Sequence, residues 1–279
     1  MRSLLPIAVF LLMVSVGLGI RLNEVFANWR RHTWGTWLLL VTATFVIPSA
    51  LALGLANFFH LTLGETAGLF LVGAAPGAPL LTRNMARRGF DLHVAASYQL
   101  WAGLMVPVMI PPVVAVAGKL YGHQIWIPPI VLLGQIVEKQ FLPLGVGILI
   151  AWYAPKIGEW CGPTLNTVGN VLLGVMMAAV LFKMGPELKL ITPWVPVAVV
   201  LLAVGSIGAM MVVRMSSGVV RQTFAVCNAN RHVGLALLLS GQYIHAKNAL
   251  PVVACYALAA PLVMFLYVKI YPAATAVQE

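Results

Sequence analysis

The sequence has few charged residues, and acidic residues are the scarcest class. Only 9% of the 279 residues are charged, and Asp and Glu together number 7. A soluble globular domain has about 25% charged residues, so this chain lacks the polar surface that a soluble enzyme or a nucleic-acid-binding module needs. Hydrophobic residues make up 61% of the chain. The composition therefore predicts an all-α polytopic membrane protein with the lipid bilayer as its surrounding and without a nucleic-acid partner.

Cysteine is also scarce, which limits the chemistry that the chain can support. The three cysteines, Cys161, Cys227 and Cys255, are odd in number and widely spaced. This pattern is not that of a disulfide framework or of a paired metal site, and no His, Asp or Glu cluster has the spacing of metal ligands. We therefore expect no bound cofactor or metal, and we leave open whether a sodium ion or a proton is coupled to function.

Nine apolar segments have the length of membrane spans. They are residues 4–20, 34–57, 63–86, 91–117, 128–153, 164–182, 190–213, 222–243 and 248–268. The first segment resembles a secretory signal, but a retained helix is favoured because eight spans follow and no small-residue cleavage site is evident. With an outside N-terminus, ten basic residues fall on the inside and five on the outside. We expect an N-out, C-in protein of a bacterial-type inner or plasma membrane.

The third of these spans contains a predicted break. Pro76 and Pro79 lack the backbone N–H of a helix, and Gly77 between them favours unwinding. The freed carbonyls cannot face lipid, so they must be buried in protein or line a wet cavity. Three polar residues follow the break directly, namely Thr82, Arg83 and Asn84. They favour a cavity over the alternative, a proline kink that neighbouring helices pack against.

The eighth span has polar residues at its centre. They are Asn228, Asn230, Arg231 and His232, flanked by apolar residues on both sides. An arginine at the centre of a span costs about 2.5–3.5 kcal/mol on insertion scales. Four polar side chains in five positions cannot share one helical face. The pattern predicts an interrupted helix, and the alternative is a loop between shorter spans.

The two predicted breaks occupy matching positions in the two halves of the chain. Two apolar spans precede each break and one long apolar span follows it. Because an odd number of spans precedes the second copy, the repeats have inverted topology. Interrupted helices at corresponding positions of inverted repeats indicate a binding site at the membrane midplane of a secondary transporter. We therefore treat residues 1–279 as a single transporter domain.

Four stretches resemble motifs of the bile acid:sodium symporter family, in the same order along the chain. They are Met13-Val-Ser-Val-Gly17-Leu, Phe45-Val-Ile-Pro48, Gly73-Ala-Ala-Pro76-Gly77 and the segment 224–236. The resemblance implies an antiporter-like fold in which two discontinuous helices cross. It also implies a core domain, at about 34–117 and 190–270, and a panel domain, at about 4–20, 128–153 and 164–182.

The chain departs from the family at the residues that bind sodium. By this resemblance the family's acidic position falls on Cys227, and its following Gln and Asn fall on Arg231 and His232. A hard cation prefers oxygen ligands, and Arg231 would repel it. Sodium coupling is therefore doubtful. One weakened ion site remains possible, through Asn228, Asn230 or freed backbone carbonyls.

The candidate site has the chemistry of an organic-anion site. Half-helix N-termini attract anions, and the Arg231 guanidinium suits a carboxylate or takes the place of a sodium ion. Alternatively, Arg231 forms a structural ion pair with a carboxylate such as Glu138. His232 is either a proton relay or a packing residue. We therefore expect a secondary transporter of a small organic anion, whose substrate and oligomeric state stay open.

Two other classes of function compete with this interpretation. A membrane-embedded enzyme would need a nucleophile and a base in contact, and Cys227 and His232 are five residues apart, which is a poor spacing on a straight helix. A channel or a non-transporting sensor is the other alternative. We expect transport rather than catalysis.

Overall fold

The chain is helical throughout the part that the computed structural model describes. That part comprises residues 4–30, 33–77, 90–120, 129–188, 191–213, 217–236, 240 and 248–271, and it contains no β-strand. The larger helices are α1 (Leu4–Leu18), α2 (Leu22–Arg30), α3 (Trp34–Val41), α4 (Ile47–Phe58), α5 (Leu63–Ala74), α7 (Leu92–Leu120), α8 (Pro129–Ile136), α9 (Leu142–Tyr153), α10 (Pro155–Leu188), α11 (Val195–Met211), α12 (Gly218–Ala229) and α14 (Ala249–Ile270). In the same described residues, the π-helical segments η1 (Thr42–Val46) and η3 (Val137–Phe141) join neighbouring helices. The predicted all-α class is confirmed.

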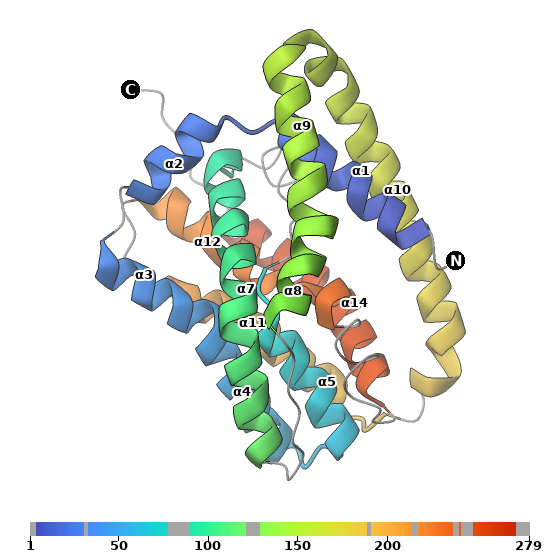
Figure 1. The fold of residues 1–279 in the computed structure, drawn as a ribbon. Helices are drawn as coiled ribbons and strands as arrows, with labels where there is room; N and C mark the ends of the chain where they lie inside the picture. Colours follow the sequence, from blue (N-terminus) through green and yellow to red (C-terminus); the bar gives the residue numbers. More distant parts are fainter. Residues whose placement is uncertain are drawn as a thin grey trace.

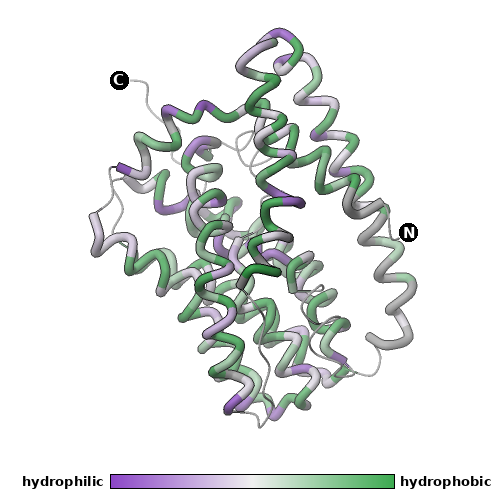
Figure 2. Tube along the Cα trace, in the orientation of Figure 1, coloured by the Kyte–Doolittle hydropathy of each residue, from purple (hydrophilic) through white to green (hydrophobic). Residues whose placement is uncertain are grey.

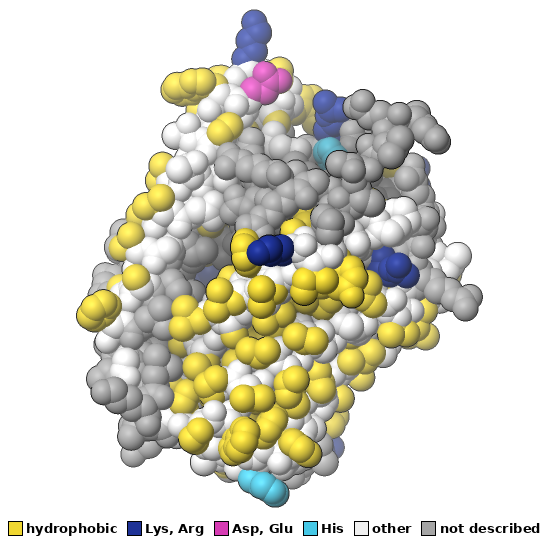
Figure 3. All heavy atoms as spheres, turned by 180° about the vertical axis from the view of Figure 1, so that it is seen from behind, with side chains coloured by type: hydrophobic (Ala, Val, Ile, Leu, Met, Phe, Trp, Pro, Cys, Tyr) yellow, Lys and Arg dark blue, Asp and Glu magenta, His cyan; other side chains and the backbone are white. Residues whose placement is uncertain are grey.

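Among the residues described, three helical stretches are long and apolar enough to cross a membrane. They are Trp34–Phe58, His93–Val116 and Ala249–Ile270, and shorter apolar helices accompany them. Hydrophobic residues dominate most of the helical trace (Figure 2). A broad hydrophobic surface is exposed on the face seen from behind (Figure 3). Such a surface suits lipid rather than water, while the number of nine spans stays a prediction.

Helices α1, α9 and α10 lie together along one side of the molecule (Figure 1). The backbones of α1 and α9 approach closely at Gly17 and Gly147. A Cβ atom on Gly147 would run into the Val14 carbonyl, and one on Gly17 would run into the Leu144 carbonyl. Small residues permit this close helix contact inside a membrane.

The remaining large helices enclose the main hydrophobic core. Buried side chains of α3, α4, α5, α7, α11, α12 and α14 form one continuous cluster. Helix α5 begins with a capping box in which Thr62 and Glu65 bond each other's backbone N–H. The buried Glu65 carboxylate also accepts hydrogen bonds from the backbone N–H of Thr192 (2.6 Å) and from its hydroxyl (2.9 Å). Glu65 thereby joins the start of α5 to the segment before α11.

Two elements differ from the spans expected from the sequence. Helix α2 is short and amphipathic, so it has no long apolar run by which to recognise it. Helix α10 runs from Pro155 to Leu188 without a break, well beyond the expected 164–182. Proline at the first position of a helix loses no hydrogen bond, so α10 starts at Pro155, immediately after Ala154 ends α9.

Candidate functional site at the crossing of two broken helices

A helix ends at each position where the sequence predicts a break. Helix α5 ends at Ala74, and the backbone from Ala75 to Gly77 is not helical. Helix α12 ends at Ala229, and the chain becomes helical again at 233–236. Both breaks are buried inside the bundle.

The two broken ends meet each other. Gly77 and Arg231 form an isolated antiparallel bridge, and the His232 N–H donates to the Pro76 carbonyl at 2.8 Å. A side chain on Gly77 would collide with the Cys227 carbonyl and the Tyr98 ring. Residues from opposite halves of the chain are thus joined backbone to backbone, at a point where only glycine fits.

The π-helix η1 and a proline leave two carbonyls without helical partners next to this crossing. The Ile47 N–H bonds the Thr42 carbonyl, so the Ala43 carbonyl lacks its usual donor four residues on. The Thr44 carbonyl lacks its donor because residue 48 is Pro48, which has no N–H. Unpaired buried carbonyls are costly, and side chains near the second break satisfy both.

The Arg231 side chain donates to one of these two carbonyls and to a third carbonyl at the end of α5. This side chain is 1% exposed, and its NH1 donates to the Thr44 carbonyl at 2.7 Å and to the Ala75 carbonyl at 3.0 Å. Its NH2 lies 3.4 Å from the Ser206 hydroxyl on α11. Within the described residues its Nε has no hydrogen-bond partner. The guanidinium therefore links η1, the end of α5 and α11.

The alternative in which Arg231 pairs with Glu138 does not match this geometry. Glu138 lies on η3 with its carboxylate 3.3 Å from the Lys139 ammonium, and both side chains are exposed. In the described part of the chain, the bonded partners of the Arg231 guanidinium are uncharged oxygens.

Asn228 is fully buried and bonded at both ends of its amide. Its Oδ1 accepts from the Tyr98 hydroxyl at 3.0 Å, and its Nδ2 donates to the carbonyls of Ala43 (3.1 Å) and Ser206 (2.8 Å). The Tyr256 hydroxyl donates to the Ala229 carbonyl at 2.6 Å, next to the end of α12. These bonds hold the broken helix between α7, α11 and α14.

His232 connects the crossing to the segment that bears η3. Its Nδ1 accepts from the Leu235 N–H at 3.0 Å, so His232 caps the helix that resumes at 233. The other ring nitrogen, Nε2, lies 2.6 Å from Nε2 of the Gln140 amide, and the tautomer of the ring decides which of the two donates. His232 is half-buried, so this contact lies at the edge of the crossing.

The remaining candidate residues are Thr82, Arg83, Asn84, Cys227 and Asn230. Thr82, Arg83 and Asn84 lie outside the described residues. Cys227 is buried and forms no hydrogen bond with His232 in the described structure, so the nucleophile and base of an enzyme are not assembled there. Asn230 is half-buried, and its N–H closes the last turn of α12 on Val226.

Sequence reasoning missed the residues that complete the crossing. They are Thr44, Tyr98, Gln140, Ser206 and Tyr256. One signal was present in the sequence, since a proline four residues after Thr44 frees its carbonyl. The others depend on how the helices cross.

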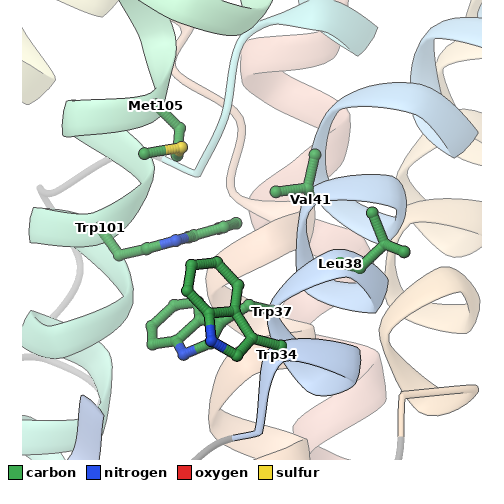
Figure 4. A pocket seen from close by; sticks show the side chains of 6 residues that line it. All are labelled: Trp34, Trp37, Leu38, Val41, Trp101 and Met105. Carbon is green, nitrogen blue, oxygen red and sulfur yellow. The ribbon is translucent and has the colours of Figure 1, made fainter. Parts of the chain in front are cut away.

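A separate apolar groove lies between α3 and α7, with a volume of about 540 Å³ (Figure 4). Its walls are Trp34, Trp37, Leu38, Val41, Trp101 and Met105. The ring centroids of Trp37 and Trp101 lie 5.4 Å apart, and the centroid of the Trp101 ring lies 6.0 Å from that of the Tyr98 ring. Because the described residues that line this groove are uncharged, they do not neutralise an anion.

Two interrupted helices that meet inside a lipid-facing bundle are the architecture of secondary transporters. A family model described as the Sodium Bile acid symporter family matches residues 6–188. The match covers more than half of the chain, so the chain belongs to this family and is an integral multi-pass membrane protein. The matched range contains Pro76 and Gly77 and ends before Arg231. No curated protein matches the sequence.

Proposed function

We propose that this chain is a secondary carrier that moves a small organic anion across a membrane by alternating access. The observation that carries the proposal is the joining of Gly77 to Arg231 and of Pro76 to His232 inside the bundle. Midplane sites of carriers form where discontinuous helices meet in this way. The family points to the same class of protein.

The charge at the crossing favours an anion as the substrate. A guanidinium keeps its proton in proteins, and among the described residues no carboxylate bonds that of Arg231. Half-buried Asn230 and His232 border it on the more accessible side. In our proposal the anion binds on that side, and Arg231 behind it supplies the attraction.

The moving parts in this proposal are a core and a panel. The core comprises the helices within 34–117 and 190–270, and the panel comprises α1, α8 to α10 and η3. The tight packing of α1 on α9 and α10 supports a panel that moves as one body. The contact between His232 and Gln140 spans the two parts. The excess of basic residues on one side supports an N-out, C-in orientation.

Uptake by proteoliposomes tests the proposal. The purified chain is reconstituted and offered labelled monocarboxylates, dicarboxylates and a steroid carboxylate in separate assays. We expect saturable uptake of at least one class, and faster entry when the same anion is present inside, since a carrier exchanges its cargo. Empty liposomes are the control. Absence of uptake for every class, or single-channel currents in place of exchange, would contradict the proposal.

A further inference from the structure

The crossing contains a set of oxygen atoms that resembles a cation site. The carbonyls of Thr44 and Ala75 and the hydroxyl of Ser206 converge from η1, the end of α5 and α11. Uncharged oxygen atoms are the ligands that hard cations accept. Each of the two carbonyls also lacks a helical donor four residues on, because residues 48 and 79 are both proline.

Arg231 already occupies the space between these oxygens. Its NH1 bridges the two carbonyls at 2.7 and 3.0 Å, and its side chain is 1% exposed. The charge is fixed by the covalent chain and cannot leave. A sodium ion placed at the same oxygens would meet a like charge at close range in a medium of low dielectric constant, where repulsion is strong.

The neighbouring amide does not provide an alternative ion site. The Asn228 oxygen accepts the Tyr98 hydroxyl, and its nitrogen donates to two carbonyls. Cys227 beside it brings a thiol, which is a soft ligand unsuited to sodium. The described residues at the crossing therefore do not fit the ion that appears in the family's name.

We propose that Arg231 permanently holds the cation position of the helix crossing in place of a sodium ion. If the chain is a carrier, as proposed above, its transport then proceeds without sodium. Arg231 is in this view a positioning residue, because its charge bonds the broken helices together whether or not a substrate is present.

The test measures melting temperatures in sodium chloride and in choline chloride at equal ionic strength, using the full chain in detergent. We expect the wild type to melt at the same temperature in both salts. Arg231→Ala leaves the carbonyls unpaired, so it should melt several degrees lower. Low-millimolar guanidinium, which replaces the lost group, should restore part of that loss, while choline should not.

Two further variants keep the test decisive if Arg231→Ala does not fold. Arg231→Lys retains the charge and should stay indifferent to sodium. Arg231→Gln retains a donor without charge and should melt higher in sodium or guanidinium than in choline. Higher stability of the wild type in sodium than in choline would overturn the inference. Wild-type stability of Arg231→Ala, or an Arg231→Gln protein that responds to neither cation, would also overturn it.

This experiment separates the inference from the proposed function, because melting does not require transport. If no anion enters proteoliposomes, the carrier proposal fails, while the melting series still decides the role of Arg231. If uptake is found, the same liposomes in choline buffer should transport at the rate measured in sodium buffer. Uptake that requires sodium would overturn the inference and leave the carrier proposal standing.

Discussion

The Tyr98 hydroxyl donates a 3.0 Å hydrogen bond to Oδ1 of Asn228, which joins the second turn of α7 to the last turn of α12. Tyr98 also lies 3.3 Å from the Thr44 hydroxyl, and its ring closes over Gly77. One buried side chain thus contacts η1 and both broken helices. The crossing is held by a network in which each member serves more than one neighbour.

This network predicts unequal losses for its two members. Asn228→Ala removes three hydrogen bonds and leaves the Ala43 carbonyl unpaired, while Tyr98→Phe removes one hydroxyl with its bonds to Asn228 and Thr44. Each buried group left unpaired costs about 1–3 kcal/mol. We expect Asn228→Ala to lower the free energy of unfolding more than Tyr98→Phe does.

A double-mutant cycle measured by denaturation in detergent checks this prediction. The double variant should be less destabilised than the sum of the single variants, because the two residues share one bond. Additive losses would show that the two side chains act independently, contrary to the geometry.

Gly77 has a matched control in Gly54. A methyl group on Gly77 would collide with the Cys227 carbonyl and the Tyr98 ring, whereas one on Gly54 in α4 would have nothing within 4 Å. Overpacking a tight contact costs about 1–3 kcal/mol, while alanine in a helix gains up to about 1 kcal/mol over glycine. Gly77→Ala should therefore lower the melting temperature and the uptake rate, and Gly54→Ala should lower neither. Equal melting temperatures and uptake rates of the two variants would show that the contact at Gly77 accommodates a methyl group.

The sequence indicated where the helices break because those signals are local. Pro76 removes a backbone donor, Gly77 favours unwinding, and the polar run from Asn228 to His232 cannot share a helical face. The helices α5 and α12 end at these positions. The family resemblance rested on the same residues, and the family model matches over the first of the two breaks.

The partners at the crossing were beyond sequence reasoning for a physical reason. Arg231 suggested an ion pair or a bound carboxylate, because those are the usual partners of a guanidinium. In the described structure it bonds backbone carbonyls, and the Thr44 carbonyl is available because of Pro48 and the crossing of η1 past the end of α12. The role of Tyr98 likewise arises from packing between segments far apart in the chain, which no local pattern records.

Glu65 offers a test of the start of α5. Its buried carboxylate accepts hydrogen bonds from the N–H and hydroxyl groups of both Thr62 and Thr192. Glu65→Ala leaves these donors without that partner, so we expect a loss of about 1–3 kcal/mol. Thermal unfolding in detergent measures this loss, at about 2–4 °C for each kcal/mol.

The control for Glu65 is Glu138, another glutamate whose side chain is exposed beside Lys139. An exposed ion pair contributes at most about 1 kcal/mol, so Glu138→Ala should melt close to the wild type. A Glu65→Ala protein as stable as Glu138→Ala would refute the role assigned to the buried carboxylate.

The contact between Gln140 and His232 predicts a variant that separates transport from stability. Gln140 is half-buried on η3, and its amide lies 2.6 Å from His232 Nε2, where the proposed panel meets the crossing. π-Helical segments are frequent at functional positions. Gln140→Ala removes one partly exposed hydrogen bond, so the melting temperature should change little. If panel and crossing separate in each transport cycle, the loss of about 0.5–1.5 kcal/mol in one conformation should change the uptake rate by about two- to tenfold. Glu138→Gln, two residues away on the same segment and exposed, should leave the rate unchanged. Wild-type uptake by Gln140→Ala would show that this bond does not take part in the cycle.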